Sequence, residues 1–313
     1  MELGPSHWPE ISMVCNGTRQ SPINISKSTT NNSLDDFVFH NYNATPLVTT
    51  VTYNGHTGQF QVTVPSDTLM IHGGGLNDIY NLAQFHFHWG SNDSYGSEHL
   101  DHGKAYPGEI HFVHWHSGKY SNLNESFKHD DGVAVLGVFI DVVQDANDPR
   151  ISKDLAKLTD YFVNIKFPGN QTNCAPFTLA SLLPKNLTYY RYLGSLTTPD
   201  CSEIVTWTVY QSPIYITSDQ MAKFRHFHRM EHLDEDLDHT NRPVQPLYNR
   251  EVYNSPTSFS SSSSSSSFFS SPSPLSAFVF FRAGIQGQCV KMMMALVFTS
   301  ISFHSFFQCE INC

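Results

Sequence analysis

The stretch Gln84–Trp89, which reads Gln-Phe-His-Phe-His-Trp, decides how this chain arranges its chemistry. Successive side chains of a β-strand point to opposite faces, so His86 and His88 share one face and the aromatic residues around them share the other. The stretch Glu109–Val113 repeats this alternation, with His111 at its centre. If the two stretches pair as neighbouring strands, three imidazoles converge on one side of the sheet.

Three histidine nitrogens with a fourth position left for water form a catalytic zinc site, whereas a structural site uses four protein ligands. The chain holds 17 histidines, so a single His-x-His pair fits a buried structural imidazole equally well. Gln84 and Glu109 change this interpretation, because each lies two residues before a histidine and on the same face. Metal-bound histidines usually donate their second ring N–H to a carboxylate or carbonyl. The pattern therefore predicts Zn²⁺ held by His86, His88 and His111.

Several blocks of sequence, in this order along the chain, resemble the α-class carbonic anhydrases. They are RQSPINI (19–25), NGH (54–56), QFHFHWG (84–90), GSEH (96–99), EIHFVHW (109–115), GSLTTP (194–199), VTW (205–207) and RPVQPL (242–247). The resemblance extends over residues 7–254 and implies a mostly β fold, a single domain around a twisted, largely antiparallel sheet with a few short helices. It also implies reversible hydration of carbon dioxide to bicarbonate and a proton, by attack of zinc-bound hydroxide.

The resemblance assigns further residues to the reaction. Thr197 lies beside the hydroxide and donates to Glu98, because an ionised carboxylate can only accept a hydrogen bond. Thr198 contacts bicarbonate, and Asp200 stands where the family often has a second proline. The substrate is small and apolar, and the positions that match the family's apolar pocket are Val113, Val135, Leu196, Val205 and Trp207.

Each cycle also has to remove a proton, and the resemblance gives this task to His56. The unperturbed pKa of histidine, about 6.5, lets it take up and release protons near neutrality. Asn54 and Gln59 match the polar positions that hold the connecting waters. Without the resemblance, a lone histidine after Asn-Gly is an ordinary turn residue.

The chain divides by composition into a domain at residues 1–254 and a Ser- and Phe-rich, low-complexity tail at residues 255–313, which we expect to be disordered. Short apolar runs between turn residues predict many strands, among them 48–53, 59–64, 133–143 and 204–210. Helices are expected at 154–162 and 219–226, each beginning near a residue suited to an N-cap.

The net charge of −10 and the lack of any Lys/Arg-rich run argue against nucleic acid as a partner. The apolar run at 292–307 is shorter than the roughly 20 residues that a spanning helix needs, so there is no clear membrane span. A zinc peptidase is not favoured, since the His-Glu-x-x-His motif is missing. His228 and His232, four residues apart, are another candidate chelating pair, but their acidic flanks favour a solvated helix end and loop.

Six cysteines are present, and the resemblance to secreted and membrane-bound family members implies a disulfide between Cys15 and Cys201. Cys174 has no evident partner and is expected to be a free or buried thiol. Eight Asn-x-Ser/Thr sequons favour a glycoprotein that is secreted or displayed at the cell surface. The chain begins without a recognisable signal peptide and without the Trp-x-Tyr segment usual in the family, so we expect its N-terminus to be truncated.

Two functions remain open from the sequence. The first is an active zinc lyase acting on carbon dioxide and bicarbonate. The alternative is a weakly active or inactive binding or matrix protein on the same fold, with the Ser-rich tail as its working part. Retention of the three histidines together with Glu98 and Thr197 favours the lyase.

Overall fold

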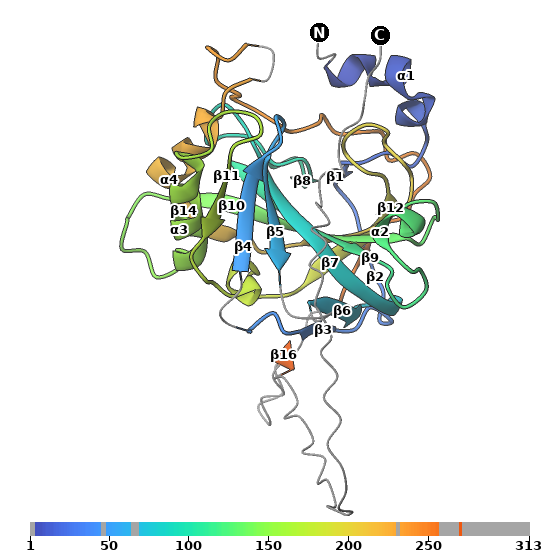
Figure 1. Ribbon diagram of the computed structural model, residues 1–313. Helices are drawn as coiled ribbons and strands as arrows, with labels where there is room; N and C mark the ends of the chain where they lie inside the picture. The colour runs from blue at the N-terminus through green and yellow to red at the C-terminus, as the bar shows by residue number, and fades with distance from the viewer. Residues whose placement is uncertain (1–3, 45–47, 64–68, 230–231, 257–268, 271–313) are drawn as a thin grey trace, which may run out of the picture. The chain divides into compact units, whose positions relative to one another are not determined.

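A large mixed β-sheet forms the centre of the molecule (Figure 1). The computed structural model describes residues 4–44, 48–63, 69–229, 232–256 and 269–270. The main path of the sheet runs in the order β11 (Gln171–Cys174), β4 (Val48–Tyr53), β5 (Gly58–Thr63), β7 (Leu76–Trp89), β9 (Gly108–Trp115), β10 (Val133–Val143), β13 (Val205–Tyr210), β12 (Tyr189–Gly194), β15 (Tyr253–Asn254) and β2 (Thr29–Thr30).

Further strands attach beside this path. β14 (Ile214–Thr217) pairs with β10, and β3 (Phe37–His40) pairs with β6 (Met70–Gly73), which pairs with β7. β1 (Asn24–Ile25) and β8 (Leu100–Asp101) form a separate two-stranded sheet. Most pairs are antiparallel, but β10 runs parallel to both β13 and β14. The predicted fold class, mostly β with few short helices, is therefore confirmed.

The alternation predicted for Gln84–Trp89 is present in β7. Phe85, Phe87 and Trp89 are fully buried on the core face. The ring of Phe85 stacks on Phe60 of β5 with centroids 4.7 Å apart, and aromatic pairs of this kind stabilise a core beyond the area they bury. The histidines of β7 consequently project from the opposite face. A hydrophobic core on one side of this strand thus positions the polar site on the other.

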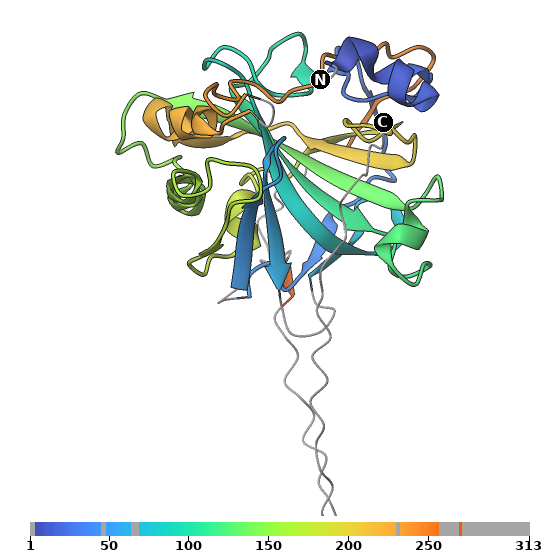
Figure 2. The same ribbon diagram turned by 45° about the horizontal axis from the view of Figure 1, so that its top comes forward.

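Two short helices lie side by side near β14 (Figures 1 and 2). Helix α3 (Lys153–Phe162) begins where the Ser152 hydroxyl accepts a hydrogen bond from the Leu155 N–H. Helix α4 (Ser218–Ala222) begins with a capping box. The helix expected at 219–226 changes to a 3₁₀ segment, η4 (Lys223–His226), in its second half.

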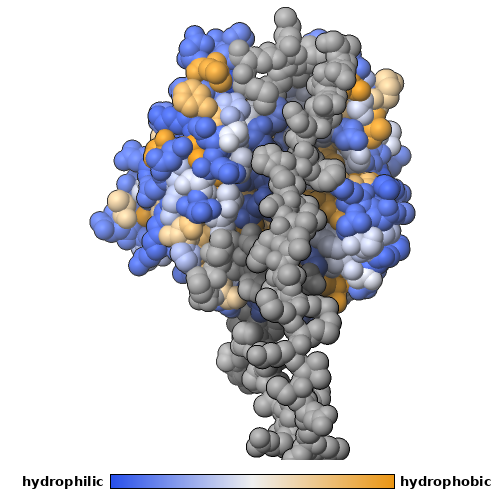
Figure 3. Space-filling model, viewed as in Figure 1, coloured by the Kyte–Doolittle hydropathy of each residue, from blue (hydrophilic) through white to orange (hydrophobic). Residues whose placement is uncertain are grey.

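The remaining helical segments are single turns. They are η1 (Pro5–His7), α1 (Trp8–Ile11), η2 (Met13–Asn16), α2 (Leu123–Ser126) and η3 (Leu179–Leu182). None of the helices in the described residues has the length and apolar character that a membrane span requires. The described residues on the face shown in Figure 3 carry mostly hydrophilic side chains, with smaller hydrophobic areas between them.

The disulfide expected between Cys15 and Cys201 is present, with Cα atoms 4.9 Å apart and a sequence separation of 186. It fixes the N-terminal helical turns to the segment that follows Thr198. Cys174 is buried without a disulfide partner, and burial raises the pKa of its thiol to about 12. This thiol therefore stays protonated at neutral pH and matches the expected buried cysteine.

Most of the tail lies outside the described residues, including the serine run and the apolar run at 292–307. Within the described part, Ser255 is buried, and its backbone N–H donates to the carbonyl of Tyr189. The short strand β16 (Phe269–Ser270) pairs in parallel with β3. The boundary at residue 254 remains a prediction.

Candidate metal centre

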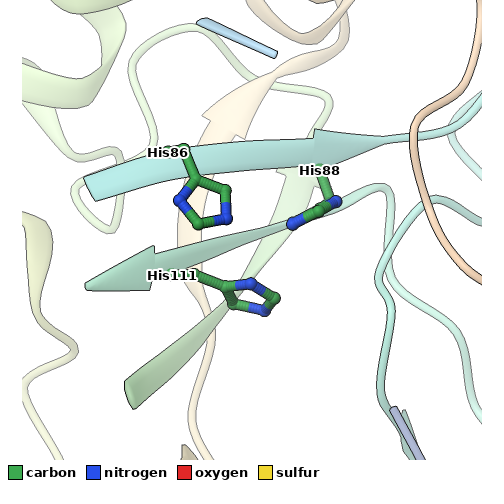
Figure 4. A group of neighbouring side chains, drawn as sticks. All are labelled: His86, His88 and His111. Carbon is green, nitrogen blue, oxygen red and sulfur yellow. The ribbon is translucent and has the colours of Figure 1, made fainter. Parts of the chain in front are cut away.

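Three histidine side chains from two adjacent strands meet on one face of the sheet (Figure 4). His86 and His88 lie on β7, and the antiparallel register places His86 directly opposite His111 of β9. One ring nitrogen from each histidine lies within 4.8 Å of the other two. The convergence predicted from the two alternating stretches is therefore present.

The outward-facing nitrogens of the β7 histidines are held by hydrogen bonds. His86 Nδ1 donates to Oε1 of Gln84 at 2.9 Å, as the two-residue spacing predicted. His88 Nδ1 donates to the backbone carbonyl of Thr240 at 3.1 Å. Both bonds leave Nε2 free to face the centre of the triad, and they fix the orientation of each ring.

Glu109 holds the third histidine and carries more contacts than the sequence indicated. Its Oε1 accepts from His111 Nε2 at 2.8 Å and from His99 Nδ1 at 2.7 Å. Its Oε2 accepts from the backbone N–H groups of Glu98 and His99. Burial raises the pKa of Glu109, but His99 and His111 outweigh this and hold it well below the usual range. Gly137 of β10 leaves room for the carboxylate, because a Cβ there would lie 2.9 Å from Oε1.

The free nitrogens have the properties of metal ligands. Burial and the neighbouring imidazoles hold the pKa of His86 well below 6.5, and burial also lowers the pKa of His88. Both rings are therefore neutral at pH 7, the form that binds metal. His88 Nε2 is buried without a hydrogen-bond partner, which is costly unless a ligand satisfies it. Three imidazole nitrogens in this arrangement fit Zn²⁺.

Glu98 lies beside the triad and is 1% exposed. Its Oε1 accepts from the backbone N–H of Arg242 at 2.9 Å. Its Oε2 forms no hydrogen bond and lies 3.5 Å from His88 Nε2 and 3.8 Å from His111 Nδ1. The expected hydrogen bond from Thr197 is thus not formed among the described residues, because this oxygen is turned toward the imidazoles.

The predicted apolar pocket residues belong to one hydrophobic cluster. In the aligned strands β9, β10 and β13, Val135 lies opposite Val113 on one side and Trp207 on the other. The Trp207 ring meets the His111 ring edge-on, with centroids 4.8 Å apart. Val205 is also buried here, and Leu196 is half-buried against the same cluster. An apolar wall therefore adjoins the triad, and its role as the substrate pocket remains a prediction.

The turn that carries His56 lies next to the triad along the sheet. The side chain of Asn54 accepts from the His56 backbone N–H at 3.0 Å and donates to Gln59 at 3.3 Å. Gln59 of β5 lies directly opposite His86 of β7. His56 itself is exposed. Asn54 thus links the turn that carries His56 to Gln59 at the start of β5.

Thr198 and the His228/His232 pair were the other positions singled out from the sequence. Thr198 is exposed, and its carbonyl accepts from the Cys201 backbone N–H at 2.8 Å. His228 Nδ1 lies 3.7 Å from a carboxylate oxygen of Asp236. Neither His228 nor His232 belongs to a potential metal-binding group of three or more ligands within the described part of the chain.

Sequence reasoning missed several residues that support the triad. His99 contacts Glu109 on one side and the Tyr192 hydroxyl, at 2.6 Å, on the other. A signal for His99 existed, because it adjoins Glu98 in a block that resembles the family. Thr240 had no such signal, since it acts through its backbone carbonyl.

Comparison with known proteins agrees with this site. Residues 3–256 match the family described as eukaryotic-type carbonic anhydrase. The chain is 40% identical over 253 residues to carbonic anhydrase 7 of Homo sapiens, with 80% of this chain and 93% of that protein covered. It is 37% identical over 251 residues to carbonic anhydrase 7 of Mus musculus, with the same two shares covered. The chain therefore belongs to the eukaryotic-type carbonic anhydrases, zinc-dependent lyases that interconvert carbon dioxide and bicarbonate.

Proposed function

We propose that His86, His88 and His111 hold the catalytic Zn²⁺ of this carbonic anhydrase. The observation that carries the proposal is the meeting of three ring nitrogens within 4.8 Å while the opposite nitrogen of each ring is hydrogen-bonded. When bound by three histidines, zinc lowers the pKa of a coordinated water to about 7 and so supplies a nucleophile at neutral pH.

Thr197 and Glu98 orient the nucleophile. The free Oε2 of Glu98 is an acceptor within the site, and its other oxygen is fixed by Arg242. A threonine hydroxyl that donates to this carboxylate must accept from the nucleophile, since it has only one proton to give. This hydrogen bond is not formed among the described residues; once made in the zinc-loaded site, it would turn the nucleophile toward the substrate and disfavour ligands that lack a proton.

Carbon dioxide occupies the apolar wall beside the triad. The substrate carries no net charge, so burial against valine and tryptophan side chains favours it over water and ions. Val113, Val135 and Trp207 form the row nearest to His111, and Val205 and Leu196 extend it. Thr198, which is exposed, binds the bicarbonate product as it leaves.

His56 transfers the proton between the site and solvent. Its support is the Asn54–Gln59 connection to the register position opposite His86, together with its exposure to buffer. An exposed imidazole equilibrates with bulk solvent, whereas His88 and His111 of the triad are buried.

The experiment that tests this function compares the full chain with His111→Ala. We expect one zinc per chain and rapid hydration of carbon dioxide by stopped flow for the parent protein. The variant should lose most of its zinc and its activity, because two imidazoles and water do not hold the site that three do. Normal zinc content and hydration in the variant would refute the ligand assignment. Zinc binding without hydration in the parent would instead favour the inactive binding protein.

We propose further that the protein is a glycoprotein of the secretory route, extracellular or at the cell surface. The disulfide is typical of an oxidising compartment. Six of the eight sequon asparagines are exposed, so a glycosyltransferase can reach them: Asn16, Asn43, Asn92, Asn124, Asn170 and Asn186. Expression in eukaryotic cells behind a signal peptide should give a product whose mass falls on treatment with an N-glycosidase. An unchanged mass would argue against glycosylation.

A further inference from the structure

His116 directly follows strand β9 and lies outside the triad. His116 is 4% exposed, and its ring stacks on Tyr80 with centroids 4.5 Å apart. Its Nδ1 lies 3.2 Å from the backbone carbonyl oxygen of Asp131. A carbonyl only accepts hydrogen bonds, so Nδ1 carries a proton, and in the singly protonated ring Nε2 presents a lone pair on the other side.

That lone pair faces another acceptor. His116 Nε2 lies 3.5 Å from Oδ2 of Asp78, yet it is buried and forms no hydrogen bond. The other oxygen of Asp78, Oδ1, already accepts from the Ile79 N–H at 2.8 Å. A buried nitrogen lone pair opposite a carboxylate oxygen is unfavourable unless something positive lies between them.

The spacing suits a metal ion. Zinc–nitrogen and zinc–oxygen bonds of about 2.0–2.1 Å at a tetrahedral angle place the two ligand atoms about 3.3 Å apart. This is close to the 3.5 Å between Nε2 and Oδ2. The Asp78 side chain is 43% exposed, so an ion can enter from solvent and keep water as its remaining ligands.

Gly118 provides the space for this carboxylate. A Cβ at this position would lie 2.3–2.5 Å from the Asp78 carboxylate atoms, closer than real contacts allow. Asp131, on the opposite side of the ring, is engaged by Lys119 at 2.7 Å and by the Tyr120 hydroxyl at 2.6 Å. The Asp131 carboxylate is thereby neutralised locally, while Asp78 keeps an oxygen that no described residue hydrogen-bonds.

We propose that His116 Nε2 and Asp78 Oδ2 form a second, solvent-accessible site for a divalent transition metal such as Zn²⁺. Transition-metal ions such as Zn²⁺ bind both imidazole nitrogen and carboxylate oxygen. Mg²⁺ and Ca²⁺ prefer oxygen ligands alone. With two protein ligands, this site binds metal more weakly than the three-histidine site, so it is filled only after that site.

The test titrates the zinc-loaded enzyme with Zn²⁺ by calorimetry. A second, weaker equivalent is expected in the parent protein. Asp78→Asn should weaken it at least tenfold, and Gly118→Ala should do the same by displacing the carboxylate while both ligands remain. Asp130→Asn, which removes an equal charge from a carboxylate that is 87% exposed, serves as the control and should bind like the parent. Replacing His116 endangers folding, so His116 is followed by ¹⁵N NMR instead.

Added Zn²⁺ should shift the Nε2 resonance of His116, with Nδ1 still protonated. Hydration activity should be the same in all four proteins, because none of the substitutions touches the triad. Absence of a second equivalent, equal second-site affinity in all four proteins, or a doubly protonated His116 ring in the presence of zinc would each overturn the proposal. The last outcome would mean that a proton, and not a metal, lies between the two side chains.

Discussion

The backbone N–H of Arg242 donates a hydrogen bond of 2.9 Å to Oε1 of Glu98, across 144 residues of sequence. The guanidinium of Arg242 is buried and donates to the carbonyl of Ser21 at 2.7 Å and to Oε1 of Gln20 at 3.0 Å. It also reaches the carbonyl of Cys15, at 3.3 Å. The N-terminal segment therefore fixes the backbone that in turn fixes the Glu98 carboxylate.

Arg242→Lys should separate catalysis from metal binding. A lysine keeps the charge but lacks the planar guanidinium that donates to several acceptors at once. The backbone at residue 242 is then held less firmly, so the Glu98 carboxylate loses its fixed position. We expect kcat/KM for hydration to fall about tenfold while zinc content stays near one per chain. Arg250→Lys, at a site where the arginine also donates to backbone carbonyls, is the matched control. Unchanged kcat/KM in Arg242→Lys would remove this positioning role.

Loss of the disulfide should lower both stability and activity. Cys15→Ser should reduce the free energy of unfolding by about 2–5 kcal/mol, the range seen when native disulfides are removed. Hydration should fail at a lower urea concentration than global unfolding, because Cys201 N–H bonds to the carbonyl of Thr198 and so anchors the Thr197 segment. Cys174→Ser, which removes a thiol without a bridge, is the comparison. Activity and fold lost together would contradict the local effect.

Glu109→Gln should weaken metal binding without unfolding the protein. The amide nitrogen of glutamine is a donor, and it would face either ring nitrogens or backbone N–H groups that are themselves donors. Zinc affinity, measured by competition with a chelator, should fall roughly 10–100-fold. Glu125→Gln, an amide substitution in a surface ion pair, should leave the affinity unchanged.

His56→Ala should lower the maximal rate of hydration but leave kcat/KM nearly intact. The ratio reports steps up to bicarbonate release, and proton removal follows them. Added imidazole buffer should restore much of the loss, because a diffusible base with a pKa near 6.5 replaces the tethered one. If kcat/KM falls as well and imidazole gives no rescue, the residue supports the structure of the turn and not the shuttle.

His114 should contribute to acid sensitivity. Burial lowers its pKa to about 3, and its ring lies 2.5 Å from the Tyr42 hydroxyl. Because the folded-state pKa is below the unfolded value of about 6.5, the unfolded state takes up a proton first as pH falls, and stability is lost between those two values. This residue should account for about 2 kcal/mol of the loss between pH 7 and pH 5.

The measurement for His114 is urea unfolding at both pH values. His114→Gln does not titrate, so it should be less stable at pH 7 but lose less stability on acidification. An identical pH slope in the two proteins would contradict this, because it would mean that His114 takes up its proton equally in the folded and unfolded states.

The sequence predicted the parts of the site that depend on the alternation of side chains between the two faces of a β-strand. Strands β4 and β10 begin and end where their apolar runs do, and the Gln84–His86 and Glu109–His111 spacings correctly gave two hydrogen bonds. What could not be predicted depends on groups without a sequence signature. The Thr240 carbonyl that orients His88 belongs to the backbone of a loop, and any residue type can supply a carbonyl.

The orientation of Glu98 was also beyond the sequence. The resemblance implied a bond with Thr197, whereas the structure turns Oε2 toward His88 and leaves it unbonded. A buried carboxylate chooses among nearby donors by small differences in side-chain rotation, which residue order does not encode. The same holds for His99, whose two ring nitrogens bridge Glu109 and Tyr192 across strands that are far apart in sequence.

The partner of His88 is 152 residues away from it along the chain. During synthesis on the ribosome, all three histidines of the triad leave the exit tunnel long before Thr240 and Arg242 are translated. At roughly 5–20 residues per second, the nascent chain spends about 6–26 seconds with its imidazoles made but Thr240 not yet translated. A metal ion that binds during that interval meets side chains that still rotate freely. We therefore expect the site to reach its native affinity only after the chain is complete.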